Sequence, residues 1–149
     1  MYHAVKSDFE KVKEIFYLHK KWFPHVRTDY MKRMIAKKNL ILENDVVITY
    51  NFYKRKQKIG DIQAFKGDCI LHQIVAKTKG TASDVLQRFF KFVNHNPLGK
   101  RVYLSVRSDN EMAKNFYLKN NMKLIGKTSW SKGTLPGDVI VYDPWTYET

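Results

Sequence analysis

The chain has little that would cross-link it or hold it in a membrane. Its 149 residues include one cysteine, Cys69, so an internal disulfide is excluded and a reducing, cytoplasmic location is expected. Its apolar runs are only a few residues long, well below the roughly 20 residues that a membrane-spanning helix needs. The opening segment Met1–Val5 lacks the pattern of a signal peptide. We therefore expect no membrane partner.

Acidic side chains are also scarce. The sequence has 27 Lys and Arg against 14 Asp and Glu, a net charge of +13, and residues 1–60 alone hold fourteen basic against six acidic side chains. Such a field attracts polyanions. Two interpretations stay open: solubility combined with an anionic cofactor, or a nucleic-acid or acidic-protein partner. The run His19–Trp22 combines cations with an aromatic side chain, and the run Lys54–Lys56 places three cations side by side. Such runs suit unstacked nucleotides, although surface lysines are common without any such role.

No linker, repeat or low-complexity stretch divides the sequence, so we expect one domain over residues 1–149. Hydrophobic spacing predicts an α/β fold, a mixed sheet with helices on both faces. The predicted strands are 2–6, 40–43, 46–53, 69–76, 101–106, 124–130 and 139–142, and the predicted helices follow Ser7, begin at Asp29, and span 83–94 and 111–121. The first helix should open with a Ser7–Glu10 capping box and end near Trp22–Pro24.

A run of small and basic residues, Lys77-Thr78-Lys79-Gly80-Thr81-Ala82, separates a predicted strand from a predicted helix. A turn of this kind exposes backbone amides, and the helix N-terminus adds partial positive charge. Gly80 and Ala82 let a phosphate approach closely, while Lys77 and Lys79 add full charges. The run has neither the Walker pattern nor the dinucleotide pattern. It fits a pyrophosphate, or alternatively a plain capped connection.

A second block predicts a helix that carries a tyrosine. Ser108 and Glu111 have capping-box spacing, and Phe116 and Tyr117 follow Ala113 by three and four residues, on one face of the helix. Asn110 precedes Tyr117 on the same side. A tyrosine on a buried helical face is ordinarily part of the core, but this pairing with a polar residue at a strand end favours a catalytic interpretation.

Together the two blocks resemble the GNAT superfamily of acyl-CoA N-acyltransferases. The family's phosphate loop has Arg or Gln, two further residues, Gly, one residue, and then Gly or Ala; the run 77–82 matches it with Lys in the first place. The family's later motif, N-x-x-A-x-x-F-Y-x-x-x-G-F, matches from Asn110 to Tyr117, with Asn121 and Met122 where Gly and Phe are usual. The resemblance is strongest over residues 70–126.

The resemblance implies a mostly antiparallel, twisted sheet that splays between the strands Ile70–Ala76 and Arg101–Val106. It implies acetyl-CoA as cofactor, with its pantetheine arm paired to the strand Ile70–Ala76. A backbone amide near Val75 would stabilise the developing oxyanion. Tyr117 is implied as the general acid that protonates the departing thiolate. The residues implied to contact the coenzyme are Ile74, Val75, Ala76, Lys77, Lys79, Gly80, Thr81, Ala82, Ser83, Asn110 and Tyr117.

The general base is less well specified. Some relatives that acetylate protein N-termini have Glu in the second strand, but Ser105 occupies that position here and cannot act as a base. His72 is the candidate, acting through a water, because histidine titrates near neutrality; lining the cleft is the alternative. Gln73 points to the opposite face of an ideal strand, unless a bulge changes the alternation. A metal is not expected, because Cys69 and His72 point to opposite faces.

The acceptor is not specified by the sequence. Trp130, in the last hairpin, and Ser105 are candidate substrate contacts. Three functions remain open: N-acetylation of a small or protein amine, modification of nucleic acid on the same fold as in Mom-type phage enzymes, and a non-catalytic nucleic-acid-binding module. The candidate catalytic residues argue against the third. Either a monomer or a homodimer is compatible with the sequence.

Overall fold

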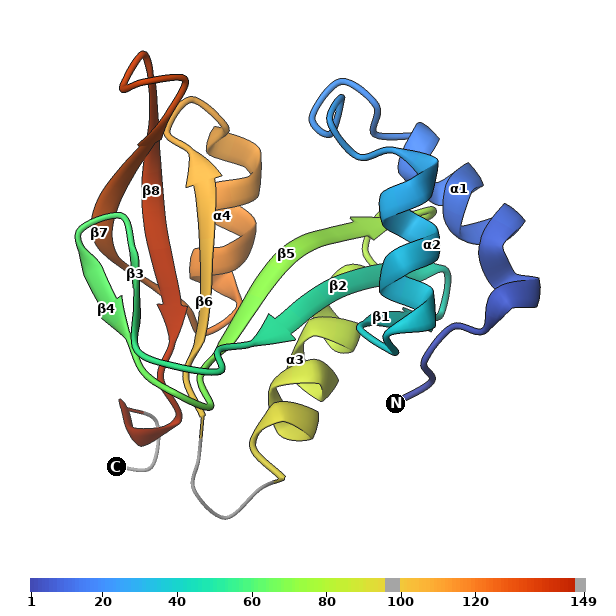
Figure 1. Ribbon diagram of the computed structural model, residues 1–149, viewed down its shortest axis with the longest axis horizontal. Coiled ribbons are helices and arrows are strands. Elements are labelled where there is room, and N and C mark those ends of the chain that lie inside the picture. The colour runs from blue at the N-terminus through green and yellow to red at the C-terminus, as the bar shows by residue number, and fades with distance from the viewer. Residues whose placement is uncertain (96–99, 147–149) are drawn as a thin grey trace. The chain divides into compact units, whose positions relative to one another are not determined.

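The computed structural model describes residues 1–95 and 100–146. Figure 1 shows the helices and strands along the chain. The helices are α1 (Phe9–Tyr17), α2 (Thr28–Ala36), α3 (Ala82–Val93) and α4 (Glu111–Lys119), with short 3₁₀ turns at Lys6–Asp8 and Pro144–Thr146. The strands are β1 (Leu40–Glu43), β2 (Val46–Phe52), β3 (Gln57–Ile59), β4 (Ile62–Ala64), β5 (Cys69–Ala76), β6 (Val102–Arg107), β7 (Lys123–Trp130) and β8 (Leu135–Tyr142).

Six strands are hydrogen-bonded in the order β1-β2-β5-β6-β8-β7. The β1–β2, β6–β8 and β7–β8 pairs are antiparallel, whereas β5 and β6 are parallel. The parallel ladder joins Cys69 to Val102 and Ile70 to Tyr103, although both strands continue well beyond these residues. The predicted α/β fold, with a mostly antiparallel sheet that splays between these two strands, is confirmed.

The chain forms two compact units, and the first contains Met1–Tyr50 and His72–Phe89. In this unit the Tyr30 hydroxyl of α2 lies 3.4 Å from Thr49 Oγ1 of β2, while the Tyr50 ring contacts Phe89 of α3 at a centroid distance of 5.2 Å. Because neighbouring strand residues point to opposite faces, α2 and α3 cover opposite faces of this sheet portion. The core against α1 and α2 consists of Ala4, Val12, Ile15, Phe16, Val26, Met31, Met34, Ile35, Leu40, Leu42, Val47 and Val75.

The second unit contains Asn51–Leu71 and the chain from Phe90 onward. Here the small β3–β4 hairpin packs on one face of the sheet, and the Asp61 amide of its turn donates to the Lys127 carbonyl of β7 at 3.0 Å. On the other face, Tyr142 stacks on Phe90 at 4.0 Å and Asp138 pairs with Lys114 of α4. The core under the hairpin consists of Ile59, Ala64, Tyr103, Val139 and Val141.

Several local predictions were wrong. Residues 2–6 form only an isolated bridge between His3 and Ile41 and then enter a 3₁₀ turn. The Asp8 carboxylate, rather than Ser7 and Glu10, accepts the Val5 amide at 2.8 Å at the start of the helical segment. The α1 helix ends at Tyr17, five residues before Trp22, and β8 begins at Leu135 instead of residue 139.

The β3–β4 hairpin was not predicted, because its three-residue strands are too short for an alternating pattern to be recognised. The hairpin depends on long-range contacts instead. A Cβ added at Gly126 of β7 would lie 2.3 Å from the Asp61 side chain, so the glycine allows this close approach. In the part of the chain that the structure describes, no helix is long and apolar enough to cross a membrane.

Candidate functional site

The loop between β5 and α3 has the geometry of an anion cradle. Gly80 has φ +94°, a conformation that L side chains rarely adopt, and a Cβ added there would meet nothing within 4 Å. Within the described ranges, the amides of Thr78, Lys79 and Gly80 donate no hydrogen bond to the protein. These exposed donors immediately precede the N-terminus of α3, where the helix dipole favours negative charge.

The charges around this loop are divided between paired and unpaired groups. Lys77 Nζ lies 3.0 Å from Glu14 of α1, whereas the exposed Lys79 takes part in no ion pair among the described residues. Asp84, in the first turn of α3, is paired with Arg88 at 3.2 Å. The arginine therefore offsets the one carboxylate in the first turn of the helix.

The end of β5 already makes contacts with other parts of the first unit. His19 Nε2 lies 2.8 Å from the Ala76 carbonyl oxygen, so the ring donates there as the Nε2–H tautomer. The Lys77 amide donates to the Asp45 carbonyl at 2.9 Å. Val75 is buried in the core, and Ile74 is half-buried. A chain that pairs with this strand edge would have to share the Ala76 carbonyl with His19.

The candidate base, His72, is an exposed residue of β5. Although part of the side chain reaches solvent, the protein around the ring desolvates it and lowers its pKa below the ordinary value. The imidazole is therefore neutral at pH 7 and able to accept a proton.

Its neighbour Gln73 is buried on the side of α2, as the alternation predicted, and belongs to a polar cluster with two hydroxyl groups. Tyr30 donates to Gln73 Oε1 at 2.9 Å, and Thr49 donates to the same oxygen. Burial raises the pKa of Tyr30, so its hydroxyl keeps its proton. The cluster fixes α2 against the sheet.

In the second unit, Asn110 is the N-cap of α4. Its Oδ1 accepts the Ala113 amide at 3.2 Å, which satisfies one of the free amides of the first turn. The Ser108–Glu111 capping box was therefore wrong, and the cap lies two residues later. The cap leaves the side-chain nitrogen Nδ2 of Asn110 available. The predicted contact of Asn110 with the coenzyme stays a prediction.

Tyr117 projects from the buried side of α4. The residue is 9% exposed, and its ring meets Phe116 edge-on at a centroid distance of 5.5 Å. Burial raises its pKa, so the phenol is fully protonated at neutral pH. None of the hydrogen bonds among residues 1–95 and 100–146 uses its hydroxyl group. A protonated, unengaged hydroxyl is suited to donating a proton or a hydrogen bond.

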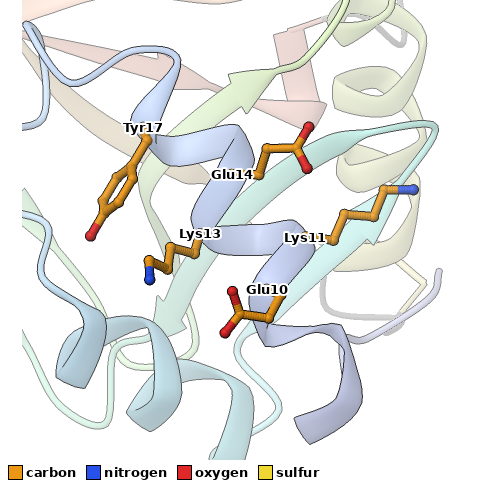
Figure 2. Close-up of a pocket in the computed structure, with 5 residues that line it drawn as sticks. All are labelled: Glu10, Lys11, Lys13, Glu14 and Tyr17. Carbon is orange, nitrogen blue, oxygen red and sulfur yellow. The ribbon is translucent and has the colours of Figure 1, made fainter.

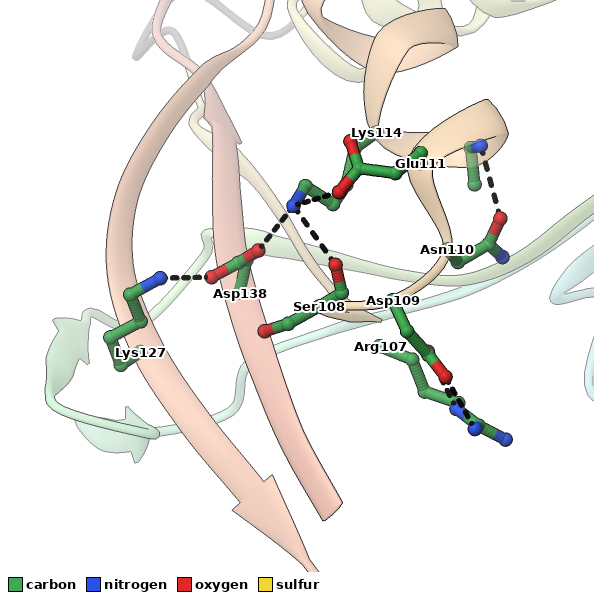
Figure 3. Close-up of polar contacts among 9 residues, drawn as sticks. Arg107, Ser108, Asp109, Asn110, Glu111, Lys114, Lys127 and Asp138 are labelled. Atoms are coloured by element: carbon green, nitrogen blue, oxygen red, sulfur yellow. Dashed lines mark hydrogen bonds and ion pairs between the residues drawn. The ribbon is translucent and has the colours of Figure 1, made fainter.

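The start of α4 is held to the sheet by an ion-pair network around the buried Asp138, drawn in Figure 3. Asp138 of β8 is 1% exposed, and Lys127 Nζ lies 2.6 Å from its Oδ1. Lys114 Nζ lies 3.2 Å from Oδ2, which is an ion-pair distance although the two groups are not aligned for a hydrogen bond. Lys114 also donates to the Ser108 carbonyl at 3.0 Å and pairs with Glu111. The hydrogen bond from Lys127 is the main cause that lowers the pKa of Asp138.

The candidate substrate contacts lie in the second unit. Ser105 is half-buried in β6, opposite Val139 of β8. Trp130 is 37% exposed in the last hairpin, with its ring against Gly137, where an added Cβ would lie 2.4 Å from the indole. Two surface cavities of the first unit, of about 340 and 470 Å³, are lined by none of the predicted site residues. In the described ranges no three His, Cys, Asp or Glu side chains gather as metal ligands would.

Sequence reasoning named His19 only as part of the run His19–Trp22 and did not predict its contact with β5, and it did not identify Glu14, Asp138 or Lys114. His19 contacts a residue 57 positions away, and Asp138 lies in a strand whose first residues were read as loop. One signal was available for Asp138: an acidic side chain directly before the apolar Val139–Val141 run. The predicted coenzyme residues fall into two groups, 74–83 in the first unit and Asn110 with Tyr117 in the second.

The sequence matches no protein-family model and no curated protein. Solved structures, however, share the fold over nearly the whole chain. A GNAT-family acetyltransferase from Bacillus cereus is 16% identical with a TM-score of 0.69, covering 95% of this chain and 94% of its own. The aminoglycoside acetyltransferase AAC(6')-Ib, solved with coenzyme A and kanamycin, is 13% identical with a TM-score of 0.72, covering 99% and 95%. GphF, a GNAT-like decarboxylase solved with isobutyryl-CoA, is 11% identical with a TM-score of 0.67, covering 95% and 97%.

Proposed function

We propose that this chain, which has the fold of the GNAT-family acetyltransferases, transfers an acyl group from an acyl-coenzyme A, acetyl-CoA foremost, to an amine. The observation that carries the proposal is the open loop at Gly80, whose free amides precede the α3 N-terminus. Two of the structures with this fold were solved with coenzyme A or an acyl-CoA. The fold neighbours give no support to base modification, so the proposed reaction is N-acylation.

The donor is held by residues 74–83 in this proposal. The amides of Thr78, Lys79 and Gly80 and the N-terminus of α3 supply hydrogen bonds and partial positive charge for the pyrophosphate. Lys79 adds an unpaired cation, and Lys77 adds a second one that a phosphate shares with Glu14. Ile74, Val75 and Ala76 supply the strand edge for the pantetheine arm.

The proposed reaction is a direct displacement. The lone pair of a neutral amine attacks the thioester carbonyl carbon, a C–N bond forms, and the C–S bond then breaks so that its electron pair leaves with sulfur. The Tyr117 hydroxyl, which holds its proton at neutral pH because burial raises its pKa, gives that proton to the thiolate. The proton lost by the amine passes through a water to neutral His72.

Substituting Tyr117→Phe tests the proposed acid. The change removes one oxygen and keeps the ring that packs on Phe116, so the fold and the affinity for acetyl-CoA should hold. Turnover should fall by about 10²- to 10⁴-fold, the range for losing a general acid. The assay follows the release of free thiol from acetyl-CoA in the presence of a panel of amines, which includes polyamines, aminoglycosides and peptides with a free N-terminus.

Phe116→Leu is the matched control, because it changes the neighbouring half-buried ring and leaves the phenol in place. This control should lose stability but keep most of its turnover. Tyr117→Phe turnover equal to that of the unmodified chain would remove Tyr117 from the mechanism. Absence of acetyl-CoA binding by the unmodified chain in calorimetry would overturn the proposed function as a whole.

A further inference from the structure

The positive charge of the first unit is concentrated in one stretch of chain, which we call the basic segment, residues 18–38. It comprises the turn after α1 and the whole of α2. The segment has a single acidic side chain, Asp29. All of its Lys and Arg side chains are exposed: Lys20, Lys21, Arg27, Lys32, Arg33, Lys37 and Lys38. A stretch of 21 residues thus carries nearly half of the net charge of the chain.

These seven cations differ from many others in having no carboxylate partner. In the part of the chain that the structure describes, none of them forms an ion pair, whereas Lys11, Lys77 and Arg88 of the same unit pair with Asp45, Glu14 and Glu43. Ion pairing is therefore available to this unit, but none of the seven cations of the basic segment uses it. Uncompensated charge of one sign raises the local concentration of an oppositely charged partner.

Aromatic rings are interleaved with this charge. Lys21 Nζ lies 5.3 Å from the Trp22 ring, Lys32 Nζ lies 4.8 Å from the Phe9 ring, and the Arg33 guanidinium lies 5.6 Å from the Tyr30 ring. These are cation–π distances. Three of the seven cations of the basic segment are thus placed over aromatic faces rather than beside carboxylates.

The end of α1 next to this segment adds an exposed ring. Tyr17 is 51% exposed, and Lys13 Nζ lies 5.7 Å from its centroid. Figure 2 shows Lys13 and Tyr17 on one side of α1 and the ion-paired Lys11 and Glu14 on the other, around a surface cavity of about 470 Å³. Glu10 also lines this cavity, but Lys13 forms no ion pair among the described residues and lies against the Tyr17 ring instead.

We propose that the basic segment, together with Tyr17, is a docking surface for single-stranded nucleic acid. Unpaired Lys and Arg bind the phosphates, and the exposed Tyr17 ring stacks with a base, the combination that single-strand-binding surfaces use. An acidic peptide would match the charge but would leave the rings without planar partners. The proposal goes beyond the acyl transfer proposed above and does not depend on it.

The first experiment measures binding of a fluorescent 20-nucleotide dT strand by anisotropy at several salt concentrations, without acyl-CoA. The triple variant K32Q/R33Q/K37Q removes three exposed charges from α2. If three phosphate contacts are lost, the slope of log K against log salt should flatten by about 2, and the affinity at low salt should fall at least about tenfold. The control K58Q/K66Q/K119Q removes the same charge from exposed sites of the second unit and should keep both values.

The second experiment tests the rings. Tyr17→Ala should weaken binding of the dT strand by about fivefold or more, as expected for the loss of one stacked base, and should leave binding of a polyglutamate peptide unchanged. Equal effects of the two triple variants would overturn the assignment to the basic segment. Polyglutamate bound as tightly as the dT strand, with no effect of Tyr17→Ala on either, would replace nucleic acid by an acidic protein partner.

Discussion

Substituting Gly80→Ala separates the proposed phosphate cradle from the stability of the loop. The residue has φ +94°, and an added Cβ would enter open space, so the methyl group meets no atom of the protein. The only intrinsic cost is backbone strain. The chain offers a matched control, because Gly133 has φ +89° and an added Cβ there also meets nothing within 4 Å. Gly133 lies in the turn of the last hairpin, away from residues 74–83 in the sequence.

The expected magnitudes differ for stability and for binding. A left-handed conformation costs an L residue about 1–2 kcal/mol, so both variants should lose a similar free energy of unfolding, or about 2–8 °C in melting temperature for a domain of this length. At Gly80 the methyl group also fills the space that a phosphate is proposed to occupy. The loss of one charge-assisted hydrogen bond, about 1.5–3 kcal/mol, would raise the Kd for acetyl-CoA by about 10- to 100-fold.

Thermal unfolding and calorimetric titration with acetyl-CoA measure the two quantities on the same samples. Titration with acetyl-pantetheine, which lacks the pyrophosphate, provides a further control, because its affinity should not change in Gly80→Ala. An acetyl-CoA affinity that is equal in Gly80→Ala and Gly133→Ala would refute the cradle. A similar loss of acetyl-pantetheine affinity would show that the substitution disturbs the strand edge rather than a phosphate site.

Two further predictions concern titrating groups. The acylation rate should fall as the pH drops through the pKa of His72, which desolvation places below its ordinary value, and His72→Ala should remove this limb of the pH–rate profile; a limb that persists would assign the base elsewhere. Asp138→Asn should lower the free energy of unfolding by about 2 kcal/mol at pH 7, because Lys114 and Lys127 lose their carboxylate partner. Since the folded pKa of Asp138 is lowered, its contribution is complete above the unfolded pKa and is lost as the pH falls through the folded value. The difference in free energy of unfolding between the unmodified chain and Asp138→Asn, measured in urea, should therefore narrow below pH 4. A difference that does not depend on pH would refute the ion-pair account.

The elements with a strong local signal could be predicted from the sequence. The bounds of β5 were predicted to the residue, because its β-branched and apolar residues are delimited by a basic loop. The turn at Asn44 and Asp45 has two positive φ values, +49° and +59°, as expected for these residue types in a hairpin turn. Asn121 has φ +67°, which explains how it replaces the usual glycine, and Met122 is buried where phenylalanine is usual.

The features that the sequence did not reveal depend on contacts between distant segments. The α1 helix ends at Tyr17, and the turn that follows carries His19 to the Ala76 carbonyl, although the apolar spacing favoured a longer helix. The cap is Asn110 rather than Ser108, because Asn110 Oδ1 accepts the Ala113 amide, while the Ser108 carbonyl accepts a hydrogen bond from Lys114, which also pairs with Asp138. Local patterns identify which residues are able to cap a helix, but tertiary contacts decide which one does so.

The proposed coenzyme site and the proposed reaction have to be tested separately, because the fold itself does not connect them. An acetyltransferase solved with coenzyme A and a decarboxylase solved with isobutyryl-CoA both share this fold, so an acyl-CoA bound at residues 74–83 would be compatible with either reaction. The two chemistries make different demands on Tyr117: acyl transfer releases a thiolate that needs a proton, whereas decarboxylation leaves the thioester intact. Free thiol released in step with amine consumption, and lost in Tyr117→Phe but not in Gly133→Ala, would therefore favour acyl transfer on chemical grounds that the fold alone does not supply.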